Sequence, residues 1–202
     1  MKIKQNYTLS QKIQLARKWD VQKSTLAILS KDEDKYIRKL VARNTNTSTT
    51  ILLNLSEDKE AEVRACVAGN RNATKRAFHS LAMDKSPLVR EMLAGNVMIT
   101  KDIVDMIYLD KEYGVRIKLA SNVSATQKAL EHLAMDEMPM VRLNVAKNPV
   151  TPIEVLRVLA RDNDKEISSC AIERLIGVKW KQKVLILFIE LVPFALHFLN
   201  IS

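Results

Sequence analysis

The sequence is poor in the residues that shape turns, β-sheets and disulfide-rich folds. It has four glycines, five prolines, 5% aromatic residues and two cysteines among 202 residues. So few turn-forming residues argue against an all-β fold and favour helices joined by short connections. Cys66 and Cys170 lie far apart, which excludes a disulfide framework and a four-thiolate metal site made by this chain alone. Two cysteines so far apart fit a reducing compartment. Residues 1–20 lack the apolar core of a secretory signal, so we expect a cytoplasmic protein.

The motifs of common enzymes are also missing. The sequence contains no glycine-rich nucleotide-binding loop, no HExxH and no GxSxG. The three histidines, His79, His132 and His197, do not fall at the spacing of metal ligands. We therefore predict that the protein is not an enzyme, with no catalytic residue, no cofactor and no metal site.

The net charge of +9 favours nucleic-acid binding only if it forms a continuous patch along the body of the protein. Residues 24–175 contain 23 basic and 21 acidic residues, so this stretch is almost neutral. The basic excess lies at the two ends of the chain. This distribution makes nucleic-acid binding the second choice.

A 26-residue repeat runs through most of the chain without an insertion. Each unit starts with Asp, has Val or Ile five residues later, and continues with Arg, Ala and Asn at fixed offsets; the sixth unit departs from this pattern after its Ile. A fixed period of this length is typical of stacked helical arrays. The columns that we expect to hold neighbouring units together are Asp58, Asp84, Asp110 and Asp136, then Arg64, Arg90, Arg116 and Arg142, then Asn70, Asn96, Asn122 and Asn148.

Each unit is predicted to form two short helices. Proline suits the first helical position, so Pro87 and Pro139 mark the start of a first helix. This helix is expected to end at the Asn that recurs at a fixed position in each unit, because Asn tolerates a left-handed conformation. A Ser or Thr column supplies the N-cap of the second helix, and Thr151 with Glu154 matches a capping box. Met83 and Met135 share one repeat position and are interpreted as core residues.

The Asp, Arg and Asn columns are interpreted as structural. Each Arg lies beside the buried Val and has an Asp at a constant offset, so Arg–Asp pairs within or between units would satisfy buried charges. The Asn side chains are expected to cap turn backbone. The alternative, a basic ladder for phosphates, is the less favoured interpretation because buried charges are normally paired.

The pattern Asp-x4-Val-Arg-x3-Ala-x-Asn, best seen from Asp84 to Asn96 and from Asp136 to Asn148, resembles the leucine-rich repeat variant family. The likeness covers about residues 26–172. It implies a right-handed superhelix of alternating α and 3₁₀ helices, and residues 1–25 lack the cysteines of that family's iron–sulfur domain. HEAT repeats share part of the pattern, but their units are longer. We therefore predict an all-α, right-handed α-solenoid of five to six two-helix units.

The ends of the chain differ from the repeats. Residues 1–25 are predicted to form N-terminal capping helices, residues 26–176 the repeat array, and residues 177–202 a hydrophobic helix or tail. The apolar run 184–201 contains Glu190 and Pro193, which argue against membrane spanning. Three alternatives stay open for it: a cap on the last unit, an oligomer contact, or contact with a membrane surface.

Variable positions on the second helices are the candidate partner-binding surface. A regular scaffold with variable exposed positions is how repeat proteins present an extended binding surface, although the same positions could simply be solvated. The residues of this surface are Lys75, Arg76, His79, Asp105, Lys128, Glu131, His132 and Arg157. The sequence thus predicts a scaffold that binds a protein or peptide; the alternative is a helical-repeat protein that binds nucleic acid, of the DNA-repair type.

Overall fold

The computed structural model describes residues 7–177. These residues form helices joined by short loops, and no strand occurs among them. The helices are α1 Leu9–Arg17, α2 Lys23–Leu29, α3 Lys35–Arg43, α4 Thr49–Leu55, α5 Ala61–Ala68, α6 Lys75–Ala82, α7 Pro87–Ala94, α8 Lys101–Ile107, α9 Tyr113–Ala120, α10 Gln127–Leu133, α11 Pro139–Lys147 and α12 Ile153–Leu159. A further helix covers residues 165–177.

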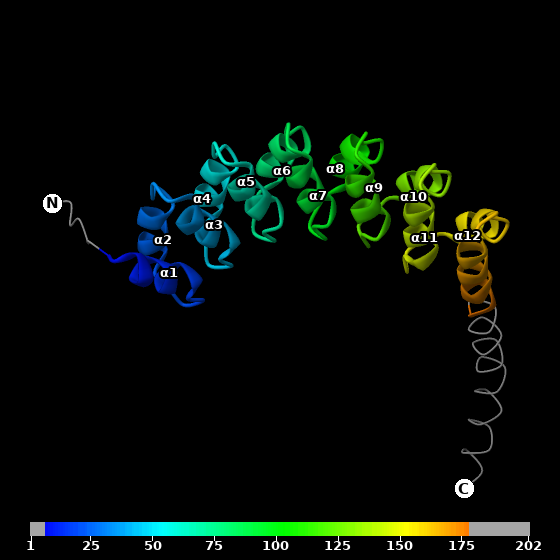
Figure 1. Ribbon diagram of the computed structural model, residues 1–202, viewed down its shortest axis with the longest axis horizontal. Coiled ribbons are helices and arrows are strands. Elements are labelled where there is room, and N and C mark those ends of the chain that lie inside the picture. The colour runs from blue at the N-terminus through cyan, green and yellow to red at the C-terminus, as the bar shows by residue number, and fades with distance from the viewer. Residues whose placement is uncertain (1–6, 178–202) are drawn as a thin grey trace, which may run out of the picture.

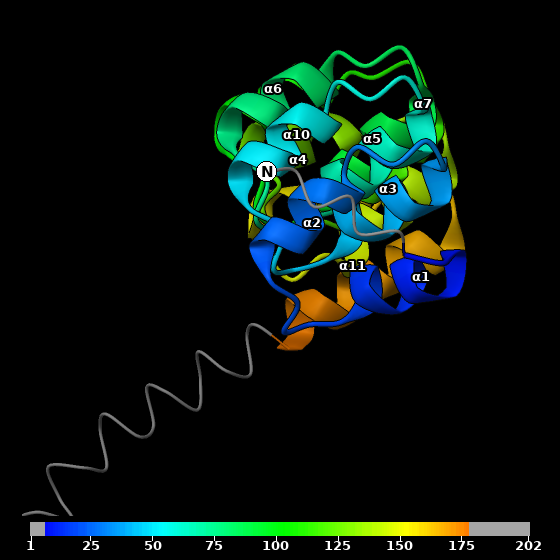
Figure 2. The ribbon, with the colours of Figure 1, turned by 90° about the vertical axis from the view of Figure 1, so that its left-hand side faces the viewer.

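The helix pairs stack into a curved solenoid, which confirms the predicted all-α repeat fold. Figure 1 shows the pairs following one another along an arc in chain order. Figure 2, viewed from one end, shows two layers: α3, α5 and α7 lie in one layer, and α2, α4 and α6 lie in the other. Successive odd-numbered helices pack against each other more extensively than successive even-numbered ones. We call the outer surfaces of these layers the odd-helix face and the even-helix face.

Stacking stabilises helices that are too short to be stable alone. Helices of seven to nine residues are marginal in water, so their stability depends on burying an apolar side. The Val column, for example Val89, and the second-helix Leu column, for example Leu81, are fully buried between neighbouring units. The core is therefore one continuous row that crosses every unit.

The helix ends differ from the predictions in three respects. Both helices of each pair are α-helices in the described units, and 3₁₀-type hydrogen bonds occur at their ends, such as Asp58 N–H to the Leu55 carbonyl. No non-glycine residue between 7 and 177 has a positive φ, so the Asn column does not use the left-handed conformation. Thr151 donates its hydroxyl to the Val145 carbonyl, and α12 begins after Pro152 instead of forming the predicted capping box.

An arginine–aspartate pair joins each unit to the next. Arg90 donates Nε and Nη2 to the two carboxylate oxygens of Asp110 at 2.6 and 3.0 Å, and Nη1 to the carbonyl of Asp84 at 2.7 Å. This two-pronged geometry is the strongest form of charged hydrogen bond. Four further arginines make the same pair with the aspartate 20 residues later: Arg38, Arg64, Arg116 and Arg142.

Three of the aspartates in these pairs, Asp58, Asp84 and Asp110, have a lowered pKa. Burial raises the pKa of Asp84, but hydrogen bonds from Arg64 and from the backbone N–H of Ser86 outweigh it, so its pKa lies below the usual range. At Asp58 and Asp110, too, burial raises the pKa, but hydrogen bonds from an arginine and from a backbone N–H outweigh it and lower the pKa.

Each arginine binds the aspartate of the following unit, whereas each asparagine of the repeat binds the preceding unit. Asn96 donates Nδ2 to the carbonyls of Ala68 and Asn70 in the preceding unit at 2.8 and 3.2 Å, and its Oδ1 accepts the N–H of Met98. The same arrangement recurs at Asn44, Asn70, Asn122 and Asn148. Each joint therefore has an Arg that binds forward and an Asn that binds back.

The first and last described units make these joints with other residues. Lys12 occupies the arginine position, and its Nζ lies 2.7 Å from Asp32 Oδ2. Arg174 occupies the asparagine position and donates to the carbonyls of Ala146 and Asn148. The first helix pair consists of α1 and α2 and ends at Leu29.

Candidate functional site

The eight predicted surface residues lie on the even-numbered helices. Lys75, Arg76 and His79 are on α6, and Asp105 is on α8. Three more, Lys128, Glu131 and His132, are on α10, and Arg157 is on α12. His79 is half-exposed and the other seven are exposed. The structure therefore brings all eight to the even-helix face, across four successive units.

A charged cluster connects α6 to α8 on this face. His79 Nε2 and Lys75 Nζ lie 2.6 and 3.2 Å from Asp102 Oδ2. Thr100 donates its hydroxyl to Asp102 Oδ1 at 2.6 Å. The Thr100 hydroxyl and the nearby Lys75 lower the pKa of Asp102 to about 2. Asp102 is thus an anion that holds two side chains of the preceding unit.

An aromatic contact connects α8 to α10. The ring of His132 packs edge-on against Tyr108, with 5.5 Å between the ring centroids, and Lys128 Nζ lies 5.2 Å from the centroid of Tyr108. Such contacts restrict the conformations of the exposed side chains of His132 and Lys128.

A row of exposed apolar side chains borders the even-helix face. Met83, Leu109 and Met135 occupy the last position of three successive units and are 79%, 59% and 74% exposed. The prediction that Met83 and Met135 belong to the core is wrong, because this position follows the end of the second helix and lies outside the stacked layers. We call these three residues the apolar row.

The apolar row is continuous with the predicted surface. Met135 lines a hollow of about 150 Å³ together with Glu131 of α10 and with Glu154 and Val158 of α12. Apolar side chains next to mixed charges are the composition of a protein–protein contact, with an apolar centre and a polar rim.

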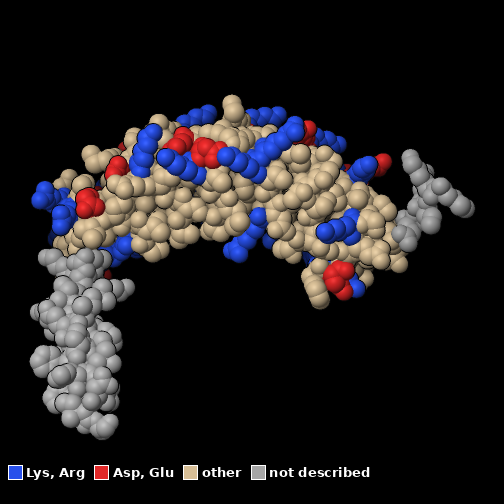
Figure 3. Space-filling model, turned by 180° about the vertical axis from the view of Figure 1, so that it is seen from behind, with Lys and Arg blue, Asp and Glu red and all other residues tan. Residues whose placement is uncertain are grey.

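Charges of both signs share the surface. Figure 3 shows basic and acidic side chains interspersed along the upper edge of the arc, beside a broad uncharged area. No continuous stripe of one sign is visible on the face that this figure shows.

Sites of other kinds are not found in the part of the chain that the structure describes. Between residues 7 and 177, no three His, Cys, Asp or Glu side chains are grouped so that they could hold a metal ion. No helix in this range is long and apolar enough to cross a membrane. Residues 184–201, for which we predicted a cap, an oligomer contact or a membrane contact, lie outside the described residues, so these remain predictions.

A comparison with solved structures supports the fold. The chain is similar to a structure described as a leucine-rich repeat variant with a novel repetitive structural motif, with a TM-score of 0.63 and 23% sequence identity, over 85% of this chain and 68% of the other. No family model and no curated protein matches the sequence. The chain therefore has the leucine-rich repeat variant fold, an array of stacked helical repeats.

Proposed function

We propose that the protein is a non-enzymatic scaffold that binds a protein or peptide through the even-helix face and the apolar row. The observation that carries this proposal is the row itself, because Met83, Leu109 and Met135 expose large apolar side chains in three successive units. Exposed Met and Leu side chains beside polar residues mark interaction surfaces on soluble proteins, and Met adapts to the shape of a partner.

Nucleic-acid binding is the alternative, and the charge distribution favours it less. Phosphate contacts require basic side chains that follow the nucleic-acid backbone. On the even-helix face, Lys75 is paired with Asp102, and Asp105 and Glu131 interrupt the basic positions. A protein partner with both charges and an apolar contact fits this surface better.

The test uses the full chain as an immobilised bait in native lysate. It compares a triple variant of the apolar row with a double control variant. The first is Met83→Ser/Leu109→Ser/Met135→Ser. The matched control is Val97→Ser/Val123→Ser, which removes two other exposed apolar side chains, 40% and 49% exposed, from the loops that follow the odd-numbered helices. We expect a bound protein that the first variant loses and the control keeps.

Salt separates the two candidate functions. Capture that persists between about 0.1 and 0.5 M salt supports a protein partner, since exposed charge interactions are screened in this range. Equal capture by the apolar-row variant, or capture of nucleic acid that falls steeply with salt, would overturn the proposal.

A further inference from the structure

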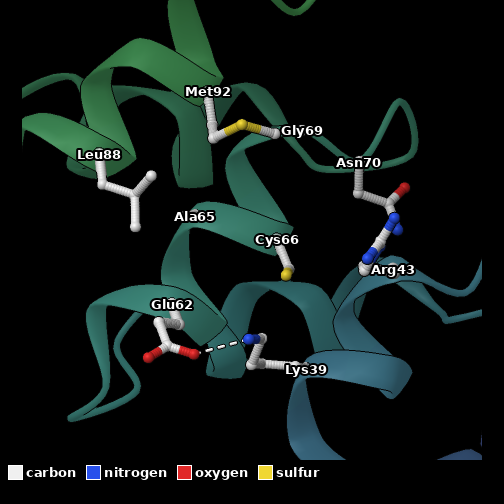
Figure 4. Close-up of a pocket in the computed structure, with 9 residues that line it drawn as sticks. All are labelled: Lys39, Arg43, Glu62, Ala65, Cys66, Gly69, Asn70, Leu88 and Met92. Carbon is white, nitrogen blue, oxygen red and sulfur yellow. Dashed lines mark hydrogen bonds and ion pairs between the residues drawn. The ribbon is translucent and has the colours of Figure 1, made fainter. Parts of the chain in front are cut away.

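A further concave region, separate from the proposed even-helix surface, lies on the odd-helix face. Two hollows of about 490 and 410 Å³ share the side chains of Lys39 and Arg43 on α3. The larger hollow continues across α5 to α7, and the smaller one extends back to α1. We call the two together the odd-face groove; Figure 4 shows the larger part.

One wall of the odd-face groove is apolar. Leu88 and Met92 of α7, 45% and 42% exposed, lie across the hollow from Lys39, with Ala65 between them. Gly69 has φ −82°, so its backbone does not require glycine. A Cβ at this position would lie 3.0 Å from Met92 Cε. The missing side chain therefore gives Met92 room to lie over the end of α5.

The other side of the groove is basic. Arg17, Lys39 and Arg43 line it, and Glu62 is the only acidic residue among those that line the two hollows. Glu62 already binds Lys39 at 2.6 Å and Lys35 at 3.1 Å. The Arg43 guanidinium makes no hydrogen bond or ion pair to a residue between 7 and 177. Arg17 donates Nη2 to the Tyr36 hydroxyl at 2.8 Å and pairs with no carboxylate between residues 7 and 177. The groove thus offers the free guanidinium of Arg43, and a second positive charge at Arg17, next to an apolar wall.

We propose that the odd-face groove binds an extended acidic segment of a partner protein that also carries an apolar side chain. Carboxylates pair with guanidinium groups in a two-pronged geometry, which suits the free Arg43. A Leu-sized side chain fits the space bounded by Ala65, Leu88 and Met92. Nucleic acid would use the basic side chains but would leave this wall unfilled, so the apolar wall favours a peptide.

The repeat spacing sets the pattern of the segment. Arg17 and Arg43 occupy the same position in successive units. Packed helices lie about 8–10 Å apart, and a segment in the extended polyproline II conformation rises about 3.1 Å per residue with three residues per turn. Such a peptide crosses one unit in about three residues, and its side chains three residues apart point the same way. The segment should therefore carry two carboxylates about three residues apart, with the apolar residue about three residues beyond.

The partner segment is not the end of this chain. Residues 178–202 contain Lys179, Lys181 and Lys183 against a single acidic residue, Glu190. Such a segment would place like charge against Arg17 and Arg43. Charge complementarity therefore assigns the groove to an acidic segment from another protein.

The test measures fluorescence anisotropy of a labelled synthetic peptide with that pattern, in both chain directions, titrated with the full-length protein. Arg43→Glu should weaken binding by about tenfold or more, because it reverses a charge at the groove. Met92→Ala should weaken it by about tenfold through lost apolar contact. The matched control Arg76→Glu makes the same charge change on the even-helix face and should leave the affinity unchanged. Circular dichroism verifies that each variant is folded.

Cys66 provides a second readout. Its thiol lies half-buried in the groove, where burial raises its pKa. In a Cys170→Ser chain, the bound peptide should slow maleimide labelling of Cys66. This measurement does not depend on any substitution in the groove.

Three results would overturn the proposal. They are equal affinity of wild type and Arg43→Glu, equal affinity for a peptide whose carboxylates are replaced by amides, and tighter binding of an oligonucleotide that is insensitive to Met92→Ala. The apolar-row variant Met83→Ser/Leu109→Ser/Met135→Ser should keep the peptide affinity. Failure at the odd-face groove is therefore distinguishable from failure at the even-helix face.

Discussion

Removal of Arg90 tests whether the repeats are held together by their Arg–Asp joints. Arg90 lies at the joint between the units that begin at Asp84 and Asp110. The Arg90→Ala variant loses three hydrogen bonds and leaves the carboxylate of Asp110 without its cation. The two side chains of the pair are only 10% and 8% exposed, so water does not replace the lost partner.

The expected loss is large for a single substitution. Breaking a buried ion pair by removing one partner costs about 3–5 kcal/mol, which is a substantial part of the stability of an ordinary domain. For a chain of this length the melting temperature should fall by on the order of 10 °C. Urea denaturation followed by circular dichroism measures the free energy of unfolding directly.

Two control variants separate the joint from other effects. In Arg90→Leu/Asp110→Asn neither charge is left unpaired, so this variant should recover most of the loss, because a buried pair replaced as a whole is often nearly neutral. Lys147→Ala breaks the exposed pair of Lys147 with Glu166, whose side chains are 55% and 69% exposed, and should cost less than about 1 kcal/mol. A change below about 1 kcal/mol in Arg90→Ala would refute the role of the joint.

Three further predictions concern the same stack. Asn96→Ala leaves the carbonyls of Ala68 and Asn70 without their donor and should lower the free energy of unfolding by about 2–4 kcal/mol in urea titrations; an effect below 1 kcal/mol would contradict the backward joint. Because Asp58, Asp84 and Asp110 have lowered folded-state pKa values, their stabilisation is complete above the unfolded pKa of about 3.9 and is lost as the pH falls through the folded value. A thermal-melt series in acid should show this fall, and it should be smaller in Arg90→Leu/Asp110→Asn. Gly95→Ala should raise the free energy of unfolding by about 0.4–1 kcal/mol, since Gly95 has φ −81° and a Cβ there would make only ordinary van der Waals contacts, none closer than 3.7 Å; destabilisation in a calorimetric scan would argue otherwise.

The helix pairs were predictable from the sequence because their signals are local. Proline at the first helical position, the Ser and Thr column before each second helix and the fixed 26-residue period act within a few residues or repeat in register. The partner of each arginine was not predictable in this way. An aspartate lies six residues before Arg90 and another lies 20 residues after it, and only the stacking of units decides that the carboxylate comes from Asp110 and the carbonyl from Asp84.

The surface features were harder to predict. Met83 and Met135 share a column with Leu109, which suggests a core position, but the same column has Lys31, Glu57 and Arg161 in other units. Those charged residues were the sequence signal that this position is exposed, and the structure places it after the end of the second helix. The odd-face groove combines side chains from four units that are distant in sequence. Its one local signal was glycine at Gly69, where the backbone conformation does not require it.

The forward and backward joints also bear on how such an array changes in length. Every internal joint uses the same donors and acceptors at the same offsets, so a whole 26-residue module can be duplicated or deleted and each new boundary is still matched. A stack shifted by a length other than a whole number of modules would place an arginine away from its carboxylate and an asparagine away from its carbonyls. Lys12 stands at the usual arginine position and Arg174 at the usual asparagine position, in the first and last described modules. The exceptions to the joint pattern therefore lie at the ends of the described array, and the interior can grow or shrink by complete modules.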